Sequence, residues 1–201
     1  MTTEIDHHRR SIRLREYDYS RAGAYFVTIC SWERECRFGE VVDGEMRLNG
    51  EGEIIREEWL RTEIVRKEVE LGEYVVMPNH VHGIVRIIDT VGAHGVRPIG
   101  GAVNELIGCA SSGCNASSGR TPCAPTMNRA PKSLGSLVAG LKSAVTKRIN
   151  IIRGNPGGPV WQRNYYEHVI RNEADYQRIA EYIENNPTRW AEDSLHPSKQ
   201  P

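Results

Sequence analysis

The stretch YVVMPNHVHGIV, residues 74–85, decides the fold predicted for this chain. Apolar and β-branched residues on both sides of Pro78-Asn79 are typical of two strands joined by a tight turn. Side chains alternate between the faces of a strand, so His80 and His82 share one face and Val81 occupies the other. Two imidazoles about 7 Å apart can bind one ion, and the pattern also fits a surface strand that carries two polar residues.

Strand and helix patterns on either side extend this hairpin to a whole domain. The order is strand, helix, strand, strand, helix, strand and one extra helix, which is typical of a ferredoxin-like sheet. The flanking segments are strands at 24–32 and 167–170, a hairpin turning at Asp43-Gly44, and helices at 49–64, 132–153 and 173–186.

Each expected helix has one apolar face. Helix 132–153 is the strongest of these patterns, with Ser133 as its N-cap and Gly154 and Pro156 after its end. The residues expected to be buried are Ile54, Ile55, Trp59 and Leu60 in the first helix, Leu134, Leu137, Val138, Leu141, Val145, Ile149 and Ile152 in the second, and Tyr176, Ile179, Ala180 and Ile183 in the third.

Composition indicates one domain with accessory segments. The chain has 201 residues, and 26 basic residues balance 26 acidic ones, so net charge neither indicates nor excludes a nucleic-acid partner. Residues 91–131 are rich in Gly, Ser and Cys, which predicts a flexible insertion. We expect a polar, basic arm at 1–20, one domain at 21–190 and a tail at 191–201.

Other features bear on location. No run of about 18 apolar residues is present, and the N-terminus lacks the apolar core of a secretory signal. The five cysteines form no CxxC pair, which argues against a zinc knuckle and predicts reduced thiols. The sequence therefore predicts a cytoplasmic protein without a membrane partner.

The last expected helix carries a tyrosine off its apolar face. Tyr182 lies roughly 100° from the centre of that face, and Asn186 lies one turn further on the same side as Tyr182. Spacing alone leaves two interpretations open: a half-buried ring with its hydroxyl in water, or a reactive phenol.

Three stretches together resemble a known family. VVMPNHVHGIV is similar to the metal-binding HUH segment of single-tyrosine transposases. RRSIRLREYDYSRAGAYFVTIC and VWQRNYYEHVIRNEADYQRIAEYIENNPTRW resemble the start and end of REP-associated tyrosine transposases. The resemblance spans nearly the whole chain apart from the insertion. It implies an α+β fold, a ferredoxin-like βαββαβ sandwich of the HUH nuclease type with an extra C-terminal helix.

The resemblance also implies an activity. His80 and His82, with Asn186, would bind Mg²⁺ or Mn²⁺, and Tyr182 would attack single-stranded DNA beside a hairpin repeat and form a 5′-phosphotyrosine. Tyr165 and Tyr166 are the competing candidates for the nucleophile, although the motif favours Tyr182. The relatives include monomers and homodimers, so both states remain open, as does association with the nucleoid.

We expect DNA contacts mainly to phosphates, with some stacking of unpaired bases. Each of these residues could instead be a solvated charge or a packed aromatic ring. The candidates are Arg9, Arg10, Lys142, Lys147, Arg148 and Arg163 for phosphates, and Trp161, Tyr165 and Tyr166 for bases.

Two alternatives keep the fold and change the activity. A ferredoxin-like sheet can bind nucleic acid without cutting it. A replication initiator or relaxase would use the same HUH chemistry on a different substrate.

Overall fold

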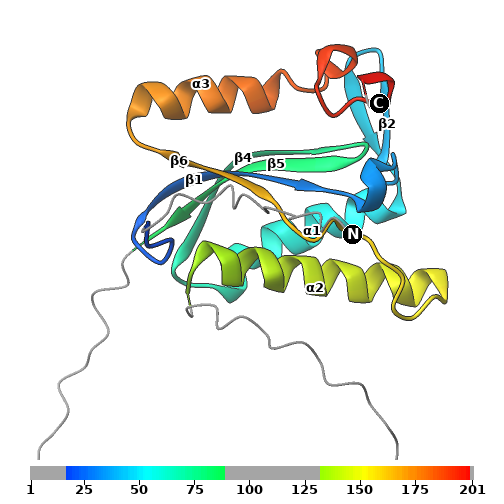
Figure 1. The fold of residues 1–201 in the computed structure, drawn as a ribbon, viewed down its shortest axis with the longest axis horizontal. Coiled ribbons are helices and arrows are strands. Elements are labelled where there is room, and N and C mark those ends of the chain that lie inside the picture. Colours follow the sequence, from blue (N-terminus) through cyan, green and yellow to red (C-terminus); the bar gives the residue numbers. More distant parts are fainter. Residues whose placement is uncertain (1–16, 89–131, 200–201) are drawn as a thin grey trace, which may run out of the picture.

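A four-stranded antiparallel sheet organises the chain. The computed structural model describes residues 17–88 and 132–199 (Figure 1). Its sheet has the order β4-β5-β1-β6, and every neighbouring pair is antiparallel. The strands are β1 (Gly23–Cys30), β4 (Val69–Met77), β5 (His80–Ile87) and β6 (Tyr166–Ile170). This order is that of a ferredoxin-like sheet, so the predicted fold class is confirmed.

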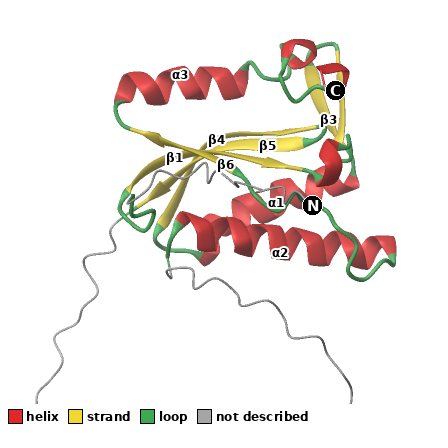
Figure 2. Cartoon of the chain, in the orientation of Figure 1, coloured by secondary structure: helices red, strands yellow, loops and turns green. Residues whose placement is uncertain are grey.

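Helices cover both faces of this sheet. Helices α1 (Gly50–Val65) and α2 (Leu134–Arg153) lie on one face, and α3 (Glu173–Glu184) lies alone on the other (Figures 1 and 2). We call these the α1/α2 face and the α3 face. Among the described residues, no helix is both long and apolar enough to cross a membrane.

The expected hairpin at Asp43-Gly44 forms a small second sheet. It pairs β2 (Gly39–Val42) with β3 (Glu45–Leu48). Asp43 and Gly44 have φ values of 53° and 79°, as a two-residue type I′ turn requires. Three short 3₁₀ turns complete the described structure, at Trp32–Arg34, Trp190–Glu192 and Pro197–Lys199.

The main apolar core fills the α1/α2 face. Strand alternation sends Val81, Gly83 and Val85 of β5 to this side, where Gly83 lies against the ring of Trp59. The apolar stripe of α2 packs here as predicted, except for its last member. Ile152 is 72% exposed, because no described element covers that side of the final helical turn. Leu60 of α1, also expected in the core, is 47% exposed.

The ends of α2 follow the sequence prediction. The Ser133 side chain accepts a hydrogen bond from the backbone N–H of Ser136 and caps the first turn. Gly154 ends the helix in the left-handed conformation, with a φ of 61°. Both features fix the length of the helix that covers the sheet.

Helix α3 rests on a smaller apolar cluster. Ile179, Ala180 and Ile183 are buried against Phe26 and Ile84 of the sheet. The expected fourth member, Tyr176, is partly buried, and its hydroxyl donates to Glu73 Oε2 on β4 at 2.7 Å. Burial and this bond raise the pKa of Tyr176 to about 12. The contacts fix how α3 lies across the sheet and therefore where Tyr182 points.

Candidate metal centre and tyrosine

The two histidines begin strand β5 and face α3. In register they oppose Cys30 and Thr28 of β1, so both point to the same side, as strand alternation predicts. Their ring centroids are 4.3 Å apart, and both side chains are buried. The arrangement brings two imidazoles close enough to share one ligand.

His80 presents a nitrogen lone pair to the interior. Its Nδ1 lies 2.8 Å from Asn79 Oδ1, while Asn79 Nδ2 donates to the carbonyls of Arg34 and Leu195. The amide oxygen must therefore accept, which places the His80 proton on Nδ1. Nε2 is left as an acceptor, and it is buried without a hydrogen-bond partner among the described residues. An orphaned buried acceptor of this kind fits a metal ligand.

His82 is held in the same manner by Thr28. Its Nδ1 lies 2.8 Å from Thr28 Oγ1, and its ring stacks on Phe26 with centroids 5.2 Å apart. Its Nε2 faces the hydroxyl of Tyr182 at 3.3 Å. A partner on Nδ1 fixes the ring so that Nε2 points into the space under α3.

Burial keeps both imidazoles neutral. Desolvation lowers the pKa of His80 to about 4, against an opposing attraction from Asp193. Desolvation, with the neighbouring His80, also lowers the pKa of His82 well below its usual value. Neutral imidazole is the form that binds a metal ion.

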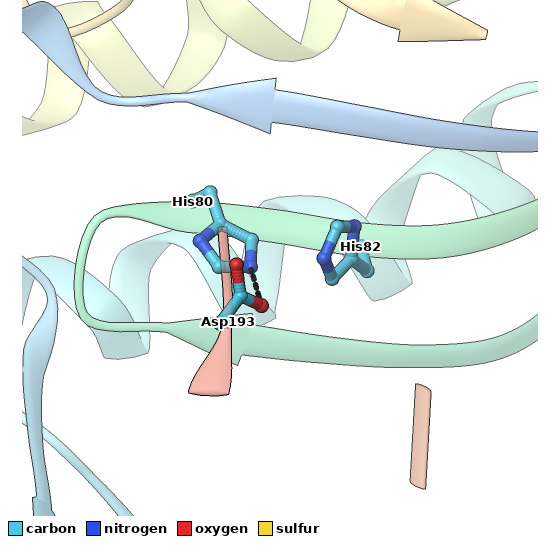
Figure 3. A group of neighbouring side chains, drawn as sticks. All are labelled: His80, His82 and Asp193. Atoms are coloured by element: carbon cyan, nitrogen blue, oxygen red, sulfur yellow. Dashed lines mark ion pairs between the residues drawn. The ribbon is translucent and has the colours of Figure 1, made fainter. Parts of the chain in front are cut away.

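A third candidate ligand comes from beyond α3. Asp193 is buried, and its Oδ2 lies 3.9 Å from His80 Nε2 (Figure 3). Ligand atoms of His80, His82 and Asp193 all lie within 4.8 Å of one another. Two imidazoles and one carboxylate form a donor set that suits a divalent transition metal. The structure therefore contains a possible metal site.

Asn186, the ligand expected from the sequence, lies beside this cluster. Its Nδ2 donates to Asp193 Oδ2 at 3.2 Å, and its Oδ1 is a buried acceptor with no hydrogen-bond partner among the described residues. It can orient the carboxylate or offer its own oxygen. Its role as a ligand stays a prediction.

Tyr182 lies between the cluster and solvent. It is 45% exposed, and its ring centroid is 5.3 Å from that of His82. Burial, and then the charge of Asp193, raise the pKa of the phenol, while a hydrogen bond from Asn186 opposes them. The phenol can therefore reach both His82 and a ligand that arrives from outside.

The two competing tyrosines are placed differently from Tyr182, although Tyr166 shares the α3 face with it. Tyr166 is 46% exposed on the edge strand β6 and opposes Thr28 in register, whereas Tyr165 lies under the ammonium group of Lys142, 6.0 Å from the ring centroid. Among the described residues, the Tyr166 hydroxyl makes no hydrogen bond to either histidine, whereas the Tyr182 hydroxyl contacts His82 Nε2.

The side chains expected to contact DNA differ in whether they already have partners within the chain. Lys142 donates to the carbonyls of Gln162 and Asn164, and Arg148 pairs with Glu57 and Glu58. Both side chains therefore have partners within the chain, and their assignment to phosphates stays a prediction.

Two further basic candidates are exposed, and one aromatic candidate is not. Lys147 and Arg163 lie at the surface, beside a pocket between α2 and the following loop. Trp161 is buried and packs on Phe38 with ring centroids 5.2 Å apart, which argues against stacking of a base on its ring. Arg9 and Arg10 lie outside the described residues, as does the 91–131 insertion.

Sequence reasoning missed three residues of the site. Asn79 and Thr28 orient the two histidines. The sequence could have indicated Asn79 because it precedes His80 in the motif. It could have indicated Thr28 through the alternation of side chains along its strand. Asp193 falls in the segment set apart as a tail, and no local pattern marks it. Only the return of the chain after α3 brings it to His80.

Sheet order defines a ferredoxin-like domain, and this one carries paired histidines on β5 that face a tyrosine on the last long helix. The chain belongs to the same family as an uncharacterized protein of Haemophilus influenzae (strain ATCC 51907 / DSM 11121 / KW20 / Rd). The two are 37% identical over 199 residues, which cover 98% of this chain and 99% of that protein. No protein-family model matches the chain.

Two solved structures have a similar backbone fold. One is a REP-associated tyrosine transposase bound to a REP hairpin, with 18% identity, a TM-score of 0.49, and coverage of 89% of this chain and 73% of that one. The other is a candidate transposase from Deinococcus radiodurans R1, with 18% identity, a TM-score of 0.38, and coverage of 86% and 95%. At these values the likeness assigns no activity or residue role to the present chain.

Proposed function

We propose that the protein is a metal-dependent transposase or endonuclease that cleaves and rejoins single-stranded DNA through Tyr182. The observation that supports this most strongly is the 3.3 Å approach of the Tyr182 hydroxyl to His82 Nε2, beside the orphaned acceptor of His80. A protein that only binds nucleic acid has no need of a phenol at a buried imidazole pair.

The metal would be held by His80, His82 and Asp193, with Asn186 as a further candidate. Mn²⁺ suits this mixture of nitrogen and oxygen donors better than Mg²⁺, which prefers oxygen alone. When bound, a divalent cation at this position supplies positive charge that polarises a phosphate and stabilises its transition state.

Tyr182 performs the covalent step. Its oxygen loses the phenolic proton and forms a bond to phosphorus, the bond from phosphorus to the 3′-oxygen breaks, and the leaving oxygen takes up a proton. The products are a 5′-phosphotyrosine and a free 3′-hydroxyl. A hydroxyl on a second strand end reverses the step and releases Tyr182. The phosphodiester energy is retained in the covalent link, so joining needs no ATP.

The substrate proposed is single-stranded DNA that folds into a hairpin beside a short recognition sequence. The motif resemblance supports this choice. Tyr182 and the histidines lie within reach of each other in one chain, so a monomer could act, and a homodimer remains compatible. A DNA-processing enzyme of this kind would work in the cytoplasm at the nucleoid.

A covalent-trapping experiment tests the proposal. The protein is incubated with labelled single-stranded hairpin DNA and Mn²⁺, and adducts are resolved on a denaturing gel. The parent should form an adduct, Tyr182→Phe should form none, and His80→Ala with His82→Ala should form very little. DNA binding without any adduct from the parent would favour a platform that binds and does not cut.

A further inference from the structure

A pocket beside Tyr182 has no role in the chemistry described above. It has a volume of about 600 Å³ and lies on the α3 face, between the sheet and the C-terminal half of α3. Its lining includes Phe26, Tyr166, Tyr182 and Arg189. Because β6 is an edge strand, the pocket lies at the border of the sheet.

Aromatic rings form one side of this pocket. Phe26 is buried, and the rings of Tyr166 and Tyr182 both meet it edge-on, with centroids 6.3 and 6.2 Å away. The two tyrosine rings are about half exposed, at 46% and 45%. Exposed aromatic faces next to a buried ring are suited to contact with a planar base.

Charged groups form the other side. Arg189 is exposed and makes no ion pair with any residue in the described ranges, so its guanidinium is available to a phosphate. Arg178 is engaged by Asp175, which also pairs with His168. The one carboxylate in the lining is that of Glu181, which can accept a hydrogen bond from the amino group of a base.

Tyr182 is common to the pocket and to the candidate metal centre. Its ring lines the pocket, while its hydroxyl faces His82 Nε2. A group that fills the pocket would therefore contact the ring of Tyr182, whose hydroxyl is the atom proposed to react.

We propose that this pocket binds the nucleotide that flanks the scissile phosphate, with Tyr166 stacking on the base and Arg189 contacting a phosphate. The inference rests on the proposed function, because it takes the DNA strand to cross Tyr182. It gives Tyr166 the base-stacking role expected from the sequence, not the nucleophile's role, and places that base next to Tyr182.

Binding without chemistry isolates the pocket. Fluorescence anisotropy with labelled dT₁₀, dA₁₀ and dC₁₀ oligonucleotides in EDTA, on a Tyr182→Phe background, excludes cleavage. Tyr166→Ala should weaken binding about tenfold, and Tyr166→Phe should retain it. Arg189→Ala should weaken binding and lower the salt dependence by about one phosphate contact, with Arg189→Lys close to the parent.

Arg171→Ala is the matched control, since Arg171 is an exposed arginine outside the pocket lining. The proposal is overturned if Tyr166→Ala and Arg189→Ala bind like the parent, or if Arg171→Ala matches Arg189→Ala in both affinity and salt dependence.

The covalent assay separates this inference from the proposed function. Adduct formation at unchanged rates in Tyr166→Ala and Arg189→Ala would leave the nuclease intact and remove the pocket. Binding that depends on both residues in a protein that never forms an adduct would retain the pocket and remove the nuclease.

Discussion

The two faces of one sheet are built for different purposes. On the α1/α2 face, β5 contributes Val81, Gly83 and Val85 to an apolar core covered by two helices. On the α3 face the same strand contributes His80 and His82, which are buried under α3 and the segment that follows it, where Trp190 packs on His80. The period of two in a strand lets one segment serve both faces.

The two faces differ in where their buried polar groups gather. Apolar contact on the α1/α2 face stabilises the fold. Both faces bury polar atoms that have no hydrogen-bond partner among the described residues, such as Trp59 Nε1 in α1 and Asn150 Oδ1 in α2, and each such atom costs stability. On the α3 face, however, the unpartnered atoms are acceptors that gather around Asp193. His80 Nε2 and Asn186 Oδ1 are such acceptors. We attribute their gathering at one place to the metal proposed to bind there, so variants should separate by face, with binding lost on one and stability lost on the other.

The largest effect is expected on metal binding. His80→Ala with His82→Ala removes both imidazoles, so Mn²⁺ binding, followed by calorimetric titration, should be abolished. His168→Ala removes an imidazole outside the cluster and should leave binding unchanged. Equal losses of Mn²⁺ binding in the two variants would mean that His80 and His82 do not form the metal site.

Gly83→Ala tests the opposite face of the same strand. An added methyl would come within 2.3 Å of the Trp59 ring, which is 1% exposed and cannot move aside. We expect a loss of about 3 kcal/mol in the free energy of unfolding, measured in urea. Gly50→Ala has open space around the new methyl and should change stability little. Similar stabilities for the two variants would contradict the tight packing described here.

Asp193→Asn sharpens the assignment of the third ligand. Loss of the carboxylate charge should weaken Mn²⁺ binding about tenfold or more. Asn186→Ala should weaken it less, since that side chain carries no charge. The reverse order in the same titration would make Asn186 the ligand and Asp193 its support.

The smallest expected effect concerns the helix caps on the two faces. Asn49 Oδ1 accepts from the backbone N–H groups of Glu51 and Gly52, and Asn49 Nδ2 donates to the Arg37 carbonyl. Asn49→Ala should cost about 1 kcal/mol in urea unfolding. Asn172 caps α3 through one such bond, and its alanine variant should lose less. A larger loss at Asn172 would place more of the stability on the α3 face than we infer.

Local pattern was sufficient for much of the fold and for half of the site. Alternation in residues 74–85 placed both histidines on one face, and helical spacing placed Tyr182 off the apolar stripe. Asp193 could not be predicted in this way, because it meets His80 through a chain reversal that no periodicity encodes. Ion pairs of Arg148 and the burial of Trp161 also depend on contacts between distant segments.

Mass-spectrometric mapping of the DNA–protein adduct tests the central claim most directly. After trapping with Mn²⁺ and digestion, we expect a nucleotide phosphate attached to the peptide that contains Tyr182. Attachment at Tyr165 or Tyr166 instead would contradict it.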